Sequence, residues 1–364
     1  MITIKKQLSL PDTYPFERIG KREEILFFDI ETTGFSADYS HLYLIGCIFY
    51  HQDCWHLLQW FAETAESEEE LLHAFFSFIK KFQILIHFNG DRFDIPFLIK
   101  RCSHLGLSYD FSDIISIDIY RRIKPYKTLI GLDSLKQKAI EKFLGISRAD
   151  LYSGGELISV YEEYLRSQNP RLYELLLLHN EDDLKGMPSI LPILYYPDFL
   201  EHPFSLVSQT MRQETAETGK TRHLLDLLCE SDYQIPISFS AEKLPFRCHG
   251  KGNLLQLSIE LYKGTLKHFY PDYQNYYYLI YEDTAIHKSI GEYVDKNARI
   301  KAKAKTCYTK KEGVFIPQLS PIWEPVMKKD RRDKLSYAAL SDVRFQDARC
   351  FPLYITQLLQ YLAI

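Results

Sequence analysis

Two acidic residues, Asp29 and Glu31, stand one residue apart at the end of the apolar run Ile25–Phe28. In a β-strand, side chains at positions i and i+2 point to the same face, so this spacing places both carboxylates together. Carboxylates in an apolar surrounding repel each other and resist desolvation, and a cation bound between them relieves both effects. The pattern therefore indicates a metal site, with an exposed strand end before a turn as the alternative interpretation.

Three further groups could take part in the same chemistry. Asp94 follows a short apolar run and the Asn89–Gly90 turn, at the start of an expected helix, where the helix dipole also favours an acid. Asp182 and Asp183 lie on another expected helix, and His179 precedes Asp183 by four residues, so those two share a helix face. Each acid alone fits an exposed helical turn; only their combination with the first acidic pair suggests a site.

Three strings of the sequence resemble, in order and in spacing, the three motifs of the DEDD family of 3′–5′ exonucleases. The strings are Phe28–Gly34 (FDIETTG), His87–Asp94 (HFNGDRFD) and His179–Asp183 (HNEDD). The resemblance covers about residues 22–195 and, within that family, is strongest to the bacterial YprB-like ribonuclease H-like proteins. Three shorter strings are similar to that branch: Asp118-Ile119-Tyr120, Leu132-x-x-Leu135-Lys136 and Leu144-Gly145-Ile146-x-Arg148.

The resemblance implies a ribonuclease H-like fold and a metal centre built from carboxylates. Asp29, Glu31, Asp94 and Asp183 would hold two divalent ions, Mg²⁺ or Mn²⁺, because such hard cations favour oxygen ligands. In two-metal phosphodiester hydrolysis, one ion lowers the pKa of the attacking water and the other stabilises the leaving 3′ oxygen. Asp29 would bridge the two ions.

The sequence departs from the family pattern at His179. The family usually has a Tyr four residues before its last Asp, or a His five residues before it, whereas here a His occupies the Tyr spacing. With an ordinary pKa near ~6.5, His179 could serve as the general base, or it could pack beside the site. Asp182 is an alternative to Asp183 as the last ligand, although the spacing from Asn180 favours Asp183.

The resemblance also implies roles in substrate binding. Thr32, Thr33 and Gly34 would lie along the terminal nucleotide through their backbone and hydroxyl groups. Asn89 would position the loop of the second motif.

The elements that must position these residues follow an α/β pattern over residues 1–200. Strands are expected at 25–31, 41–50, 55–61 and 84–88 and within 109–119, and helices behind Ser67 and at 93–102, 157–166 and 171–185. The succession predicts a ribonuclease H-like mixed β-sheet flanked by helices. Residues 201–364 alternate apolar and polar residues, as in 253–262 and 276–281, and end in an apolar helix from residue 352. They predict a strand-rich α+β domain of unrecognised fold.

Charge is divided unevenly between these two parts. Residues 1–200 have a net charge of −8 and residues 201–364 a net charge of +4, within a total of −4. The stretch Lys296–Lys311 contains seven basic residues and no acid, and Tyr308, Phe315 and Trp323 are interleaved with or follow it. Basic residues with aromatic neighbours suit a single-stranded nucleic acid, with Lys301, Lys303 and Lys305 as the candidate contacts. A solvated helix face is the alternative interpretation.

Composition narrows the class of protein. The small net charge argues against a uniformly basic protein that coats polyanions. Seven scattered Cys without a CxxC pair argue against a disulfide framework or a structural zinc site. The N-terminus has no apolar segment typical of a secretory signal, and no apolar run approaches the ~20 residues that span a bilayer, so we expect a cytoplasmic protein without membrane contact.

Together these observations predict a metal-dependent 3′–5′ exonuclease that acts on single-stranded DNA or RNA. One alternative is a catalytically silent nucleic-acid-binding or scaffold protein that keeps the fold. The other alternative is a ribonuclease H-like endonuclease, which would not require a free 3′ end.

Overall fold

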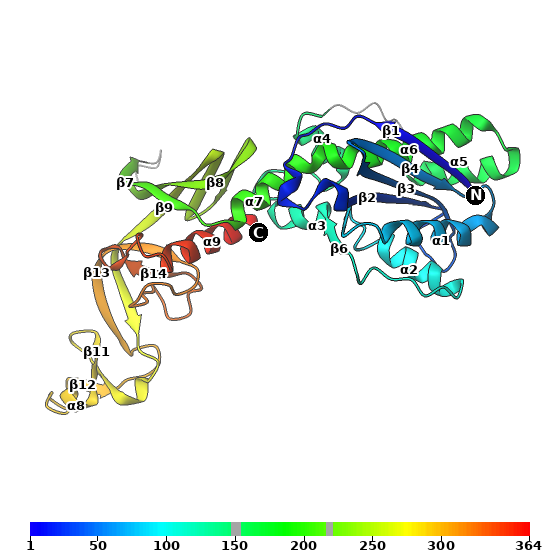
Figure 1. Ribbon diagram of the computed structural model, residues 1–364. Helices are drawn as coiled ribbons and strands as arrows, with labels where there is room; N and C mark the ends of the chain where they lie inside the picture. The colour runs from blue at the N-terminus through cyan, green and yellow to red at the C-terminus, as the bar shows by residue number, and fades with distance from the viewer. Residues whose placement is uncertain (147–153, 216–220) are drawn as a thin grey trace. The chain divides into compact units, whose positions relative to one another are not determined.

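The computed structural model describes residues 1–146, 154–215 and 221–364 (Figure 1). Arg148, the last residue of one string quoted above, lies outside the described residues. The chain divides into two compact units: unit 1 comprises Met1–Lys127 and Leu132–Pro197, and unit 2 comprises Thr128–Gly131 and Asp198–Ile364.

The described part of unit 1 is organised around one six-stranded mixed sheet. Its strand order is β1-β4-β3-β2-β5-β6, and the first three pairings are antiparallel whereas β2-β5 and β5-β6 are parallel. The strands are β1 (Ile2–Leu8), β2 (Ile25–Thr32), β3 (Leu42–His51), β4 (Cys54–Phe61), β5 (Ile84–His87) and β6 (Ile115–Asp118). The strands are rich in β-branched and aromatic residues, and the central ones are buried on both faces because helices cover the sheet.

Helices lie on both faces of this sheet (Figure 1). Helix α1 packs against β3 and β4, and α6 packs against β2 and β3. The apolar stripe of α1, Leu71, Leu72, Phe75, Phe76 and Ile79, recurs at helical spacing and is buried. The helices are α1 (Glu68–Ile79), α2 (Asp94–His104), α3 (Ile119–Ile123), α4 (Gln137–Phe143), α5 (Gly154–Ser167) and α6 (Pro170–Ile190). The predicted mixed sheet flanked by helices is confirmed.

On the β5 side, the described part of the sheet lacks a strand beside the end of β2, where Asp29 and Glu31 lie. Strand β5 pairs with β2 only from Ile25 to Phe27, whereas β2 continues to Thr32. The end of β2 therefore has a strand partner on its β3 side alone. The backbone and side chains of Asp29 to Glu31 are consequently open to residues from α2 and α6.

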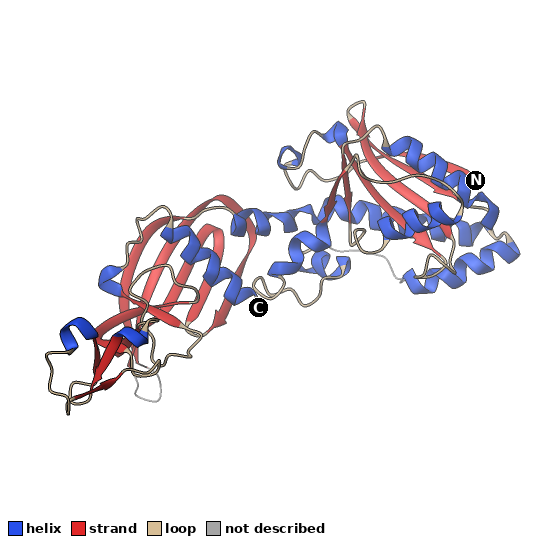
Figure 2. Cartoon of the chain, turned by 90° about the horizontal axis from the view of Figure 1, so that it is seen from below, coloured by secondary structure: helices blue, strands red, loops and turns tan. Residues whose placement is uncertain are grey.

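Unit 2 is strand-rich, as predicted. Its larger sheet is antiparallel with the order β14-β13-β9-β8-β7, and a smaller sheet has the order β11-β10-β12. Helix α9 packs against β8 and β9 (Figure 2). The elements are β7 (Ser205–Thr215), β8 (Thr221–Lys243), β9 (Phe246–Phe269), β10 (Tyr276–Leu279), β11 (Thr284–His287), α8 (Lys288–Gly291), β12 (Arg299–Lys301), β13 (Tyr308–Gln318), β14 (Ser336–Ala339) and α9 (Cys350–Ala363); α7 (Tyr195–Glu201) includes the point where the two units divide.

Among the described residues, no helix is long and apolar enough to cross a membrane.

Candidate metal and nucleic-acid site

The five candidate catalytic residues line one cavity of unit 1. Asp29 and Glu31 come from β2, Asp94 begins α2, and His179 and Asp183 lie one turn apart on α6. The cavity has a volume of about 830 Å³. Asp182, the alternative last ligand, is not among the residues that line it. The geometry thus gathers side chains that are up to 154 positions apart in the sequence.

The carboxylates of the cavity are held close together and away from water. Burial, followed by the charges of neighbouring carboxylates, raises the pKa of Asp29 and of Glu31 well above their ordinary values. Burial also raises the pKa of Asp94 to about 7, although the backbone N–H groups of Asp94 and Ile30 donate to that carboxylate and oppose the shift. The three raised pKa values therefore reflect burial first, and for Asp29 and Glu31 also the repulsion between neighbouring carboxylates.

The donor set of the cavity fits a divalent cation. Within the described residues, no Lys or Arg side chain forms an ion pair with Asp29, Glu31 or Asp94. Ligand atoms of Glu31, His179 and Asp183 all lie within 4.8 Å of one another. Hard divalent ions prefer several carboxylate oxygens as ligands. A divalent cation bound here would also balance negative charge for which the described residues provide no Lys or Arg partner.

His179 faces the acids directly. Its Nε2 atom lies 3.3 Å from Asp183 Oδ2 and 3.8 Å from Glu31 Oε1. The side chain is buried, so its imidazole is part of the cavity wall rather than of the surface. This position suits an exchange of protons with a group held between the carboxylates.

A buried amide relay behind Asp29 was not predicted from the sequence. Asn180 Nδ2 donates to Asp29 Oδ2 at 2.9 Å, and Asn180 Oδ1 accepts from Gln59 Nε2 at 2.9 Å. Gln59 Nε2 also donates to Leu177 O, so the relay joins β4 and α6 to the acid. Gly46, opposite Asp29 in the sheet, makes room, because a Cβ there would lie 2.0 Å from Asn180 Oδ1.

Signals for this relay were present in the sequence. Gly46 interrupts an apolar strand, and a glycine inside a strand often marks a close approach of another group. Gln59 is a polar residue within an apolar run, Asn180 lies in the polar string that follows four leucines, and both are fully buried. Buried polar residues of this kind require partners, which is the property that links them.

A second polar cluster shapes the loop that leads to Asp94. Asp118 accepts hydrogen bonds from the backbone N–H groups of Asn89 at 2.8 Å and Asp91 at 3.3 Å. His87 Nδ1 accepts from Gly90 N at 3.1 Å. Asn89 adopts a left-handed conformation with φ 63° and lines the cavity. The cluster therefore braces the turn, and the positioning role of the Asn89 side chain stays a prediction.

The loop after β2 holds the remaining residues of the first motif. Thr32 Oγ1 donates to Gly34 O at 2.8 Å, and Thr33 Oγ1 accepts from His41 N at 2.8 Å. None of Thr32, Thr33 and Gly34 is among the residues that line the cavity. Their hydroxyl groups stabilise the loop itself, and contact with a nucleotide remains a prediction.

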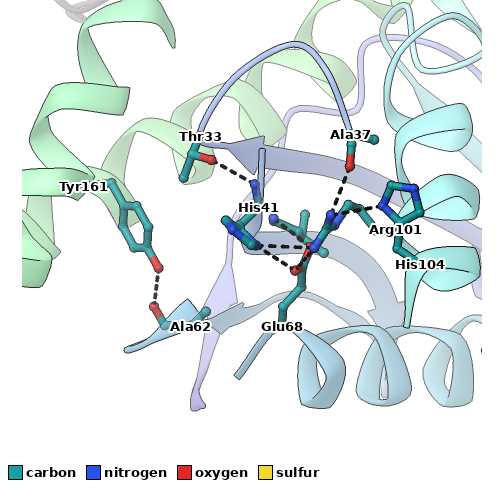
Figure 3. A network of polar contacts seen from close by, with 9 residues as sticks. Thr33, Ala37, His41, Ala62, Glu68, Arg101, His104 and Tyr161 are labelled. Carbon is teal, nitrogen blue, oxygen red and sulfur yellow. Dashed lines mark hydrogen bonds and ion pairs between the residues drawn. The ribbon is translucent and has the colours of Figure 1, made fainter. Parts of the chain in front are cut away.

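A buried ion pair anchors this loop to the helices (Figure 3). Arg101 of α2 donates to both carboxylate oxygens of Glu68 of α1, at 2.7 and 2.6 Å, and to Ala37 O at 2.9 Å. Glu68 also accepts from Leu42 N at 2.9 Å. Because both charged side chains are buried, the pair fixes the loop that follows the acidic motif.

The basic stretch of unit 2 lies at the surface. Lys301 is exposed at the end of β12, and Lys303 and Lys305 are exposed in the turn that follows. The interleaved aromatics do not share this exposure: Tyr308, Phe315 and Trp323 are buried. The idea that these rings stack on bases is therefore wrong, because they pack inside unit 2 instead.

Comparison with known proteins agrees with the fold of unit 1. The family model of the RNase H superfamily matches residues 26–195. None of the curated proteins compared with the chain matches it. Among solved structures, the chain is similar to the family B DNA polymerase from the hyperthermophilic archaeon Pyrobaculum calidifontis, with 14% identity and a TM-score of 0.38. That similarity covers 69% of this chain and 35% of the polymerase chain, so the chain spans about a third of the polymerase's length.

Residues 26–195 thus form an RNase H-like domain. Proteins with this fold are generally hydrolytic nucleases that use divalent metals. The acidic groups described above could bind such metals.

Proposed function

We propose that this protein is a metal-dependent 3′–5′ exonuclease of the DEDD type, closest to the YprB-like branch, that hydrolyses single-stranded DNA or RNA from its 3′ end. The observation that carries the proposal is the convergence of Asp29, Glu31, Asp94 and Asp183 on one cavity, with no Lys or Arg of the described residues paired to the first three. Such a set holds divalent cations and little else.

Asp29, Glu31, Asp94 and Asp183 would hold two divalent ions, Mg²⁺ or Mn²⁺. When bound, the ions supply Lewis-acid chemistry at the scissile phosphate. Asn180 orients Asp29 through an uncharged hydrogen bond of 2.9 Å. His179 would accept the proton of the attacking water at Nε2, close to Glu31 and Asp183. The 3′ nucleotide would lie along Thr32, Thr33 and Gly34, and Asn89 would position the loop of the second motif.

The decisive experiment measures cleavage of 3′- and 5′-labelled single-stranded DNA and RNA in Mn²⁺ and in EDTA. We expect mononucleotides to be released from the 3′ end, and this release to disappear in EDTA and in Asp183→Asn. Asp182→Asn is the matched control, since it changes the neighbouring acid on the same helix without altering the cavity wall. A substrate blocked at its 3′ end distinguishes exonuclease from endonuclease cleavage.

Two outcomes would overturn the proposal. Binding of single strands without any metal-dependent cleavage would leave a silent nucleic-acid-binding protein. Cleavage that needs no free 3′ end would leave an endonuclease.

His179 and the unit 2 lysines need separate tests. If His179 is the general base, His179→Ala lowers the rate and flattens its dependence on pH between 6 and 9. If Lys301, Lys303 and Lys305 hold the strand, replacing all three lowers the dependence of binding on salt. An unchanged profile or an unchanged salt dependence removes the respective role.

A further inference from the structure

Three lysines line the cavity that contains the acids, and none of them belongs to the basic stretch of unit 2. Lys127, Lys136 and Lys138 contribute to its lining, together with the rings of Phe88 and Tyr120. Acids from β2, α2 and α6 and amines from both sides of Leu132 therefore share one cavity, and Asp133 lies in the sequence between Lys127 and Lys136.

Two of these lysines do not neutralise the acids of β2. Within the described residues, neither Lys127 nor Lys136 is ion-paired with a carboxylate, and Asp29 and Glu31 have no Lys or Arg partner. These two lysines and these two acids are therefore available to external ions. The acids suit a divalent cation, whereas the amines suit the phosphates of a polyanion.

The lysine-bearing residues are attached to the helix that carries the last acid. Gln137, between Lys136 and Lys138, donates through Nε2 to Asp183 O at 3.1 Å. Gly186 permits this approach, because a Cβ there would lie 2.2 Å from Gln137 Nε2. Lys136 and Lys138, which flank Gln137, are thus held next to the helix that carries Asp183.

Aromatic rings complete this wall. Tyr120 and Phe88 are half-buried and meet edge-to-face with ring centroids 6.1 Å apart. Amines beside partly exposed rings are the combination that binds a single strand, through phosphate contacts and base stacking. The volume of about 830 Å³ lies within the about 300–1,000 Å³ that small-ligand sites offer.

We propose that Lys127 and Lys136 bind the phosphates next to the scissile one, so that unit 1 grips the single strand by itself. This inference rests on the proposed function for the identity of the substrate. It differs from the proposed grip by Lys301, Lys303 and Lys305, since those residues belong to unit 2.

The test measures binding of a 5′-fluorescein-labelled oligothymidylate of 20 nucleotides by anisotropy, across a salt series, in EDTA so that no cleavage occurs. For Lys127→Gln/Lys136→Gln we expect weaker binding and a log–log salt slope that is smaller by about 1.4, from two contacts of about 0.7 each. Lys80→Gln/Lys81→Gln, which removes two charges at the exposed end of α1, is the matched control and should keep the slope. Lys127→Arg/Lys136→Arg should restore it.

The inference would be overturned if Lys127→Gln/Lys136→Gln kept the melting temperature and the salt slope of binding of the unsubstituted protein. Because binding is measured without metal, this result is independent of whether the protein is a nuclease. If it cleaves, a second comparison uses thymidine 5′-(4-nitrophenyl phosphate), which has one phosphate. The double Gln variant should lose more kcat/KM on the oligonucleotide than on that ester, and equal losses on both substrates would contradict binding of neighbouring phosphates.

Discussion

Replacing Gly46 by alanine tests whether the candidate site depends on the close packing behind Asp29. A Cβ at this position would lie 2.0 Å from Asn180 Oδ1 and 2.5 Å from Leu184 Cδ1. Ordinary contact begins at 3.4 Å, so Asn180 must move by about 1.4 Å. That movement breaks the 2.9 Å hydrogen bonds that Asn180 makes with Asp29 and with Gln59.

The expected cost follows from those two losses. Inserting a methyl group into a packed core destabilises by about 1–3 kcal/mol. Leaving a buried amide without its partners costs about 1–3 kcal/mol more. We therefore expect Gly46→Ala to lower the free energy of unfolding by at least about 2 kcal/mol. We also expect Mn²⁺ affinity to fall about 10- to 100-fold, since a group that orients a ligand is displaced.

Gly155→Ala is the matched control, because it makes the same substitution at an exposed position of α5 where no atom lies within 4 Å. There alanine should stabilise by about 0.5–1 kcal/mol, so the two variants are expected to differ in sign. Urea unfolding in EDTA measures the stability, and isothermal calorimetry with Mn²⁺ measures the affinity of the folded protein. Wild-type stability in Gly46→Ala would refute the packing argument, and reduced stability with wild-type Mn²⁺ affinity would refute the positioning of Asp29.

Three further predictions concern charge. First, burial raises the pKa of Asp94 from 3.8 to about 7, so between these pH values the folded protein binds a proton that the unfolded chain does not. The free energy of unfolding without metal should therefore fall as the pH rises from about 4 to 7. Asp94→Asn should make this fall smaller, as measured by thermal unfolding in EDTA. Second, Mn²⁺ at 100 times its Kd should stabilise the protein by about 2.7 kcal/mol, and Asp29→Asn should abolish this gain. In EDTA the same variant should melt at a higher temperature than the unsubstituted protein, because one repelling charge is gone. A lower melting temperature in EDTA would contradict the proposed repulsion. Third, Arg101→Met should lower the free energy of unfolding by about 3–5 kcal/mol, because Glu68 is left buried without the guanidinium group. Adding Glu68→Gln should recover part of this loss in urea unfolding. A double variant that recovers nothing would show that the buried charge of Glu68 is not the cause.

The fold of unit 1 could be predicted because each of its elements is encoded locally. The apolar run around Phe27 requires a buried strand, and the helical spacing of Leu71, Phe75 and Ile79 requires a helix with one buried face. The order of such elements restricts the layer arrangement to few possibilities. The acids at positions 29 and 31 could be placed on one face for the same reason, since strand periodicity is a local property.

Residues that act through distant partners could not be predicted in this way. Gln59 and Asn180 are separated by 121 positions and meet only because β4 and α6 pack together. The lysines of the cavity wall could not be predicted because no local pattern shows that Lys127 and Lys136 lie beside acids that are distant in the sequence. Tyr308 shows the opposite error, since its place among lysines suggested exposure but the strand pattern of β13 buries it.

The partners of two buried acids show how the fold separates a structural carboxylate from one available for chemistry. Glu181 accepts from Lys6 at 2.7 Å and Lys185 at 2.5 Å; burial raises its pKa, but these two ammonium groups bring it below the ordinary value. Asp29 instead accepts from the uncharged amide of Asn180. An ammonium group there would repel a divalent cation, whereas an amide fixes the orientation of the carboxylate and adds no positive charge. Asp29 is therefore left without a cationic partner in the protein, which is what a metal ligand requires and what Glu181 lacks.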